Sequence, residues 1–195
     1  MTLIIAAKVI WGLGIAAWYV IRHPYARQSR RVATLRQSDR VQERALLACA
    51  SLGLFIIPLV YVATNAPRFA NYPLSPVQAA LGTLVFAGAL WLFHRAHKDL
   101  GKHWSAVLEI REQHTLVRTG VYSRIRHPMY ASFWLWAIAQ ALLLPNFIAG
   151  PAGLIGIGLL YFLRIGREEQ LMLDTFGDEY RRYMSETKRI VPGVY

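Results

Sequence analysis

The stretch RHPMYASFWLWAIAQALLLPNFIAGPAGLIGIGLLYFLRIGREEQ, residues 126–170, decides the fold. It contains two apolar blocks, 129–144 and 147–165, with only Pro145 and Asn146 between them. A helix needs about 20 apolar residues to cross a bilayer. Apolar blocks of this length without a polar face are typical of membrane helices. The stretch therefore predicts two membrane helices joined by a tight hairpin.

The rest of the chain repeats this pattern three times, at 3–21, 45–64 and 76–93. Apolar and aromatic residues make up 55% of the sequence, and charged residues make up 17%. An ordinary soluble domain carries about 25% charged residues. A soluble helical protein would also need polar faces on most of these blocks. We therefore expect an all-α integral membrane protein, a single membrane domain over 1–195 with five transmembrane helices and a polar C-terminal segment, 166–195.

The basic residues predict how the helices are oriented. All of the 22 lysines and arginines except Lys8 and Arg68 follow the first, third or fifth apolar block. The positive-inside rule makes that side cytoplasmic, with the N-terminus outside and the C-terminus inside. The net charge of +11 then reflects topology and attraction to anionic lipid headgroups, not binding of nucleic acid. We expect the cell membrane in a prokaryote or the endoplasmic reticulum membrane in a eukaryote, with the first block as an uncleaved anchor.

The motif Arg-His-Pro occurs twice, in two different settings. After the first apolar block, Pro24 is expected to stop the helix. In the second copy, Pro128 can occupy the first position of a helix, where its missing N–H costs nothing. The unpaired N–H groups of that first turn favour an anionic ligand. His127 flanks this terminus and Tyr130 lies in its first turn, so the second copy is the candidate for chemistry.

A second polar cluster follows the fifth apolar block. Arg164 and Glu168 are four residues apart and share one face of a helix that continues out of the membrane. They form either an interfacial ion pair or a functional pair. Glu169 lies on a neighbouring face, where we expect a solvated or structural role. Cys49, the single cysteine, is expected to be a small core residue.

These segments together resemble the isoprenylcysteine carboxyl methyltransferase family. The resemblance runs from residue 113 to residue 194, about two-fifths of the chain. Its landmarks are HTLVRTGVYSRIRHPMY (114–130), the helical hairpin, RIGREEQLML (164–173) and FGDEYRRYM (176–184). The related phospholipid N-methyltransferases share the RHPxY and double-glutamate elements, whereas HTLV favours the carboxyl-methylating branch.

The resemblance implies S-adenosylmethionine as cofactor, bound at the cytoplasmic side between the connection of helices three and four and the C-terminal segment. It implies catalytic roles for Arg164, Glu168 and His127, with Arg164 holding the substrate carboxylate and Glu168 meeting the cofactor's ammonium. His127 can bond either the ammonium or the carboxylate, depending on its protonation. The implied cofactor-binding residues are His114, Thr115, Leu116, Val117, Tyr122, His127, Pro128, Met129, Tyr130 and Glu168.

The leading functional hypothesis is methylation of the carboxylate of a lipidated, isoprenylcysteine-like substrate that enters from the bilayer. An alternative is N-methylation of an amine such as a phospholipid headgroup, with Glu168 or Glu169 as the base. An alternative of another class is a non-enzymatic haem-binding or transport subunit that uses His94, His97 and His127. We expect no metal site, because no cysteine completes the histidine pair His94 and His97. Membrane lipids are the expected partners, and the sequence does not give the oligomeric state or the acceptor.

Overall fold

A computed structural model describes residues 2–29, 34–37, 40–101, 109–111 and 115–194. Its helices are α1 (Thr2–Ser29), α2 (Arg40–Ser51), α3 (Ile57–Thr64), α4 (Pro76–Leu100), α5 (Pro128–Leu143), α6 (Ala152–Phe176) and α7 (Asp178–Glu186). A π-helical turn, η1 (Leu52–Ile56), joins α2 to α3 without a break. The short elements are the 3₁₀ turns η2 (Arg68–Ala70) and η4 (Gly120–Ser123) and the strands β1 (Thr34–Gln37) and β2 (Glu109–Arg111).

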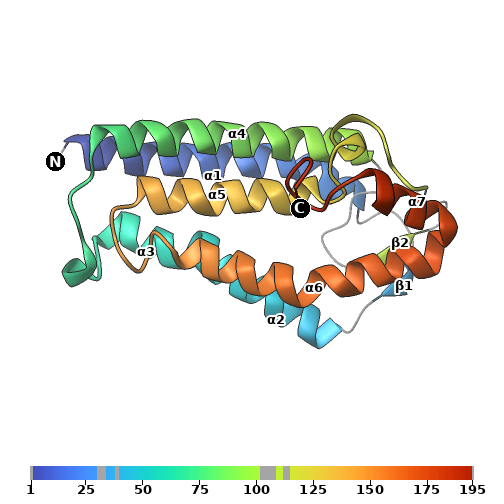
Figure 1. The fold of residues 1–195 in the computed structure, drawn as a ribbon. Helices are drawn as coiled ribbons and strands as arrows, with labels where there is room; N and C mark the ends of the chain where they lie inside the picture. Colours follow the sequence, from blue (N-terminus) through green and yellow to red (C-terminus); the bar gives the residue numbers. More distant parts are fainter. Residues whose placement is uncertain (1, 30–33, 38–39, 102–108, 112–114, 195) are drawn as a thin grey trace.

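The long helices lie in two layers, with α1, α4 and α6 running in one direction and α5 and the α2–η1–α3 helix running in the other (Figure 1). One layer holds α1, α4 and α5, and the other holds the continuous α2–η1–α3 helix beside α6. The ends of α1, α4 and α6 and the starts of α2 and α5 lie at one end of the molecule, together with α7 (Figure 1). The strands β1 and β2 pair antiparallel at the same end, so the expected all-α fold carries one small ribbon in its connections.

Three helices of the described chain are long and apolar enough to cross a membrane, which makes this an integral membrane protein. They are the spans Thr2–Gln28, Val41–Thr64 and Pro76–Leu100. By contrast, α5 has only 16 residues, and α6 carries several charged residues in its second half. The five-span topology remains a prediction.

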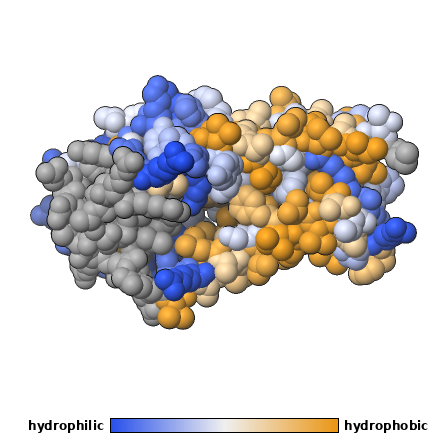
Figure 2. Space-filling model, turned by 180° about the vertical axis from the view of Figure 1, so that it is seen from behind, coloured by the Kyte–Doolittle hydropathy of each residue, from blue (hydrophilic) through white to orange (hydrophobic). Residues whose placement is uncertain are grey.

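The outward faces of the helices are apolar. Leu13 on α1, Leu84 on α4 and Phe162 on α6 are each about two-thirds exposed. Apolar residues cover the half of the molecule away from α7 (Figure 2). Such a surface suits lipid tails as its solvent. Cys49 belongs to this outer surface and is exposed, so its expected place in the core was wrong.

The first helix is longer than expected, because α1 runs through Pro24 to Ser29. A proline inside a helix removes one backbone hydrogen bond and usually ends or kinks the helix. Side-chain contacts hold the chain here. The Tyr25 ring lies 4.9 Å from the His97 ring of α4, and the Arg22 guanidinium lies 5.2 Å above the Trp18 ring. The prediction that Pro24 stops the helix was therefore wrong.

The connection between α5 and α6 is wider than a tight hairpin, because α6 begins at Ala152 and not at residue 147. Asn146 is completely buried, and its Oδ1 accepts hydrogen bonds from the backbone N–H groups of Ile148 (3.0 Å) and Ala149 (2.8 Å). Its Nδ2 donates to Asn71 Oδ1 at 2.7 Å. An asparagine that bonds its own following backbone favours a turn over a helix, so residues 147–151 form a loop.

The π-helical turn explains how the second span accommodates Pro58. In η1 the N–H of Ile57 donates to the carbonyl of Leu52, five residues back. The next bond of that kind would join Pro58 to the Gly53 carbonyl, but proline has no N–H. Gln140 of α5 replaces the missing donor, since its Nε2 lies 3.0 Å from the Gly53 oxygen. A buried amide thus links the two layers.

Gly53 also marks the closest approach of η1 to α6. A Cβ added at Gly53 would lie 2.3 Å from the Ala152 carbonyl oxygen, so the backbones would have to separate. We expect Gly53→Ala to destabilise the protein by about 1–3 kcal/mol, as overpacking does. The measurement is the thermal unfolding midpoint in detergent. Gly12→Ala is the control, because nothing lies within 4 Å of its new Cβ; an equal shift in both variants would contradict the close contact.

Candidate functional site

The second Arg-His-Pro copy is held between α5 and the C-terminal segment. Pro128 is the first residue of α5 and His127 is its N-cap, as the sequence predicted. The backbone N–H of Arg126 donates to the Lys188 carbonyl at 2.7 Å, and that of His127 donates to the Arg189 carbonyl at 2.9 Å. The motif therefore lies alongside a segment about 60 residues later in the chain.

Glu169 is the centre of the most highly connected cluster. Its side chain is only 6% exposed, and its carboxylate accepts from Arg126 Nη2 at 3.0 Å and from Arg189 Nη2 at 2.6 Å. His127 Nε2 lies 3.3 Å from the same carboxylate. Arg126 also donates to the Thr187 carbonyl. Of the two roles expected for Glu169, the structure contradicts the solvated one and fits the structural one, since three buried or half-buried basic groups surround it.

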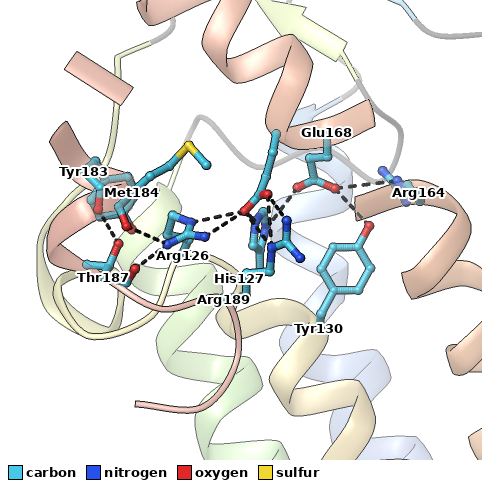
Figure 3. A network of polar contacts seen from close by, with 10 residues as sticks. Arg126, His127, Tyr130, Arg164, Glu168, Tyr183, Met184, Thr187 and Arg189 are labelled. Atoms are coloured by element: carbon cyan, nitrogen blue, oxygen red, sulfur yellow. Dashed lines mark hydrogen bonds and ion pairs between the residues drawn. The ribbon is translucent and has the colours of Figure 1, made fainter. Parts of the chain in front are cut away.

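Glu168 connects the motif to Arg164. Its Oε2 accepts a hydrogen bond from the Tyr130 hydroxyl at 2.9 Å and lies 3.7 Å from Arg164 Nε. Its Oε1 lies 3.6 Å from His127 Nδ1. The prediction that Arg164 and Glu168 share a helix face is confirmed. Figure 3 shows a connected row of side chains that runs from Thr187 and Arg126 through His127 to Glu168 and Arg164.

Arg164 is buried where α6 passes the start of α2. Its side chain is 10% exposed, and its Nη2 forms an ion pair with Glu43 Oε1 at 3.0 Å. Its Nε is also buried and has no hydrogen-bond partner among the described residues. A buried N–H group without a partner costs free energy comparable to a lost hydrogen bond. Arg164 therefore has donor capacity available for a ligand.

Opposing effects set the charges of the cluster. Burial by itself would raise the pKa of Glu168, but the hydrogen bond from His127 and the charge of Arg164 lower its pKa to about 2. The pKa of Glu169 is likewise held far below its ordinary value, because the bonds from His127 and Arg189 outweigh burial. Burial would lower the pKa of His127, but the two glutamates raise it. The two carboxylates therefore favour the protonated form of His127.

These shifts predict how stability depends on pH. A raised pKa means that protonated His127 stabilises the folded state fully below its ordinary pKa of 6.5, and that this contribution is lost as the pH rises through the raised value. The contribution of ionised Glu168 to the stability of the folded state is present above pH 4.5 and is lost as the pH falls toward 2. We expect the melting temperature to be highest between about pH 5 and about pH 6.5. The advantage of wild type over His127→Gln should shrink at alkaline pH; a constant difference would contradict a charged histidine.

The remaining predicted residues lie around this cluster or lead to it. Pro128 and Met129 form the first turn of α5. Tyr122 is buried in η4, where its carbonyl accepts from the Tyr183 hydroxyl at 2.6 Å. Thr115, Leu116 and Val117 lie in the segment that leads to η4. His114 lies outside the described residues.

Sequence reasoning missed three charged members of the site, Glu43, Arg126 and Arg189, and it named Glu169 only as an alternative base. Arg126 belongs to the Arg-His-Pro motif and Glu169 belongs to the double glutamate. Their opposite charges were the signal that the two side chains could pair. Glu43 and Arg189 gave none, because each is one of many charged residues outside the apolar blocks.

The arrangement suits a small ligand that carries both a positive and a negative group. Glu168 is 26% exposed and can accept from a cation. The first N–H groups of α5, at Met129 and Tyr130, have no partner within the helix and favour an anion. The buried Arg164 Nε supplies a further donor. Within the described ranges, no group of three or more metal-ligating side chains gathers.

Comparisons with known proteins find similarity to one family. The family model for isoprenylcysteine carboxyl methyltransferase (ICMT) matches residues 80–174. The protein-S-isoprenylcysteine O-methyltransferase of Schizosaccharomyces pombe is 29% identical over 151 residues, which cover 75% of this chain and 63% of that protein. The human protein-S-isoprenylcysteine O-methyltransferase is 34% identical over 86 residues, covering 44% of this chain and 29% of that protein.

The fold agrees with this match. A solved structure of the eukaryotic intramembrane Ras methyltransferase ICMT superposes with a TM-score of 0.54 at 23% identity, over 80% of this chain and 54% of that one. The chain thus spans between about a third and two-thirds of the curated relatives' lengths in these matches. The matched residues include the second Arg-His-Pro copy and the double glutamate. Over these residues the chain is similar to the isoprenylcysteine carboxyl methyltransferase family.

Proposed function

We propose that this protein is a membrane methyltransferase that uses S-adenosylmethionine to esterify the carboxylate of a lipidated, isoprenylcysteine-like acceptor. The names of the curated relatives support the reaction class. The observation that carries the proposal is Arg164, which is buried between Glu43 and Glu168 with an N–H group that makes no hydrogen bond among the described residues. A guanidinium with spare donors in a buried position suits recognition of a carboxylate.

The residues around the start of α5 fit S-adenosylmethionine. When bound, this cofactor supplies a methyl group on a sulfonium. Glu168, held by the Tyr130 hydroxyl, is placed to accept from the ammonium group of its amino-acid part. The first N–H groups of α5 suit its carboxylate. Tyr122 and the segment Thr115–Val117, with His114, would complete the cofactor site between the connection of α4 and α5 and the C-terminal segment.

The protein's part in the reaction is positioning. A carboxylate is already ionised at neutral pH, so the acceptor needs no general base. Arg164 would orient the carboxylate toward the methyl group. The side chains around Glu168 and Arg164 would exclude water from the reacting groups. The lipid tail of the acceptor would lie against the apolar outer faces of the helices and enter sideways from the bilayer. From the distribution of basic residues, we propose five spans, with the end of the molecule that carries α7 in the cytoplasm and the N-terminus outside.

The test is methyl transfer from radiolabelled S-adenosylmethionine to N-acetyl-S-farnesylcysteine by the detergent-purified protein. We expect a labelled product that mild alkali hydrolyses, because a methyl ester is alkali-labile. Phosphatidylethanolamine serves as the competing acceptor. An alkali-stable product formed on its amine, with none on the acid, would overturn esterification and favour the N-methyltransferase alternative.

A further inference from the structure

We infer that Glu43 of α2 is a positioning residue for the acceptor: it holds the Arg164 guanidinium in the orientation that receives the acceptor carboxylate. This inference rests on the proposed function and adds a residue to it. Glu43 lies well before residues 80–174, which the family model matches. It lies in the first turn of the second span, Val41–Thr64, far in sequence from the other members of the site.

Glu43 is buried and directed at one nitrogen of Arg164. Its side chain is 4% exposed, although it lies in the first turn of an otherwise polar helix start. The neighbouring residues Gln42 and Arg44 are exposed. A buried carboxylate is costly unless it is paired, and the ion pair with Arg164 Nη2 at 3.0 Å provides that pairing. The fold therefore buries this one acidic group of α2 against the candidate substrate arginine.

Arg164 is held from two sides. Glu43 engages Nη2, and Glu168 lies 3.7 Å from Nε. The guanidinium is planar and rigid, so the ion pair of Nη2 with Glu43 restricts its orientation, while Nε keeps no hydrogen-bond partner among the described residues. Fixing a long side chain before the ligand arrives reduces the ordering that binding must otherwise supply. Glu43 would thus raise affinity for the acceptor without touching it.

A purely structural role for Glu43 makes a different prediction. Packing of the α2–η1 segment on α6 rests on close backbone contacts at Gly53 and Gly156. A second polar contact between α2 and α6, from Arg167 Nη1 to Gln42 Oε1 at 2.7 Å, lies outside the cluster. If Glu43 only joined the two helices, its loss would lower stability and weaken the binding of every ligand together. A positioning role affects the acceptor selectively.

The experiment compares Glu43→Ala and Glu43→Gln with Gln42→Ala, which removes the neighbouring contact between the same two helices. The measurements are KM and kcat for N-acetyl-S-farnesylcysteine, and calorimetric binding of S-adenosylhomocysteine. We expect Glu43→Ala to raise the acceptor KM ~10-fold, with cofactor-product affinity within ~2-fold of wild type. Glu43→Gln keeps an oxygen acceptor for Arg164 and should restore most of the affinity. Gln42→Ala should match wild type.

The outcomes separate this inference from the proposed function. An active wild type with an unchanged KM in Glu43→Ala overturns the role of Glu43 alone. Equal losses of acceptor and S-adenosylhomocysteine binding overturn it in favour of a structural role. A wild type that neither binds nor methylates the acid overturns both. If Glu43→Ala does not fold, Glu43→Asp is measured instead. This variant keeps the charge but moves the carboxylate away from Arg164 by one methylene. An unchanged acceptor KM in Glu43→Asp also overturns the inference.

Discussion

Glu169→Ala is expected to abolish S-adenosylhomocysteine binding and to lower the melting temperature more than any other single change of a charged residue in the site. The substitution leaves Arg126, whose side chain is 7% exposed, without its carboxylate partner. It also removes the carboxylate that Arg189 engages at 2.6 Å. Removing one partner of a buried ion pair costs about 3–5 kcal/mol. His127 would lose a partner in the same step, so the start of α5 and the C-terminal segment should separate.

Thermal unfolding and calorimetry in detergent measure both effects. Glu186→Ala is the matched control, because Glu186 pairs with Arg118 at an exposed position. Exposed ion pairs contribute about 0–1 kcal/mol, so the control should unfold close to wild type and bind normally. A Glu169→Ala protein that behaves like this control would show that the cluster around Glu169 does not hold the site together.

Arg164→Ala is expected to lower kcat/KM for the acceptor acid by about 100- to 1,000-fold, the range for losing one donor that stabilises a reacting group. The residue lies beside Glu168 and not at the start of α5, so S-adenosylhomocysteine affinity should stay within a few-fold of wild type. Steady-state kinetics give kcat/KM for the acceptor acid, and calorimetry on the same preparation gives the affinity for S-adenosylhomocysteine.

Arg167→Ala separates loss of this guanidinium from loss of positive charge on α6. Arg167 lies three residues further along the helix, where it bonds the Leu163 carbonyl at 2.8 Å and Gln42. This variant should keep near-normal turnover. Equal activity of Arg164→Ala and Arg167→Ala would show that Arg164 has no specific role in methyl transfer.

The existence of the long helices could be predicted, but their ends could not. Apolar content alone decides that a block of about 20 residues forms a membrane helix. The ends depend on contacts between distant residues. Tyr25 meets His97 of α4, and α1 therefore continues past Pro24. Asn146 bonds Asn71 and its own following backbone, and α6 therefore begins five residues later than expected.

The residues of the candidate site also divide into those that the sequence could predict and those that it could not. Arg164 and Glu168 follow from helical spacing, and His127 and Tyr130 follow from the proline that starts α5. Glu43 could not be found, because its partner is more than 100 residues away in sequence. The double glutamate concealed two environments: Glu168 is partly open, whereas Glu169 is enclosed by basic groups that only the folded chain brings together.

The pairing of Arg126 with the C-terminal segment has a consequence for the order of biosynthesis. The carbonyl groups that Arg126 and His127 bond belong to Thr187, Lys188 and Arg189, about 60 residues later. Ribosomes add about 5–20 residues per second, so several seconds pass between the translation of the motif and that of its partners. By then α5 and α6 have been made and can enter the bilayer. The candidate site can therefore form only after both α5 and α6 have been made, and insertion of these helices does not require it.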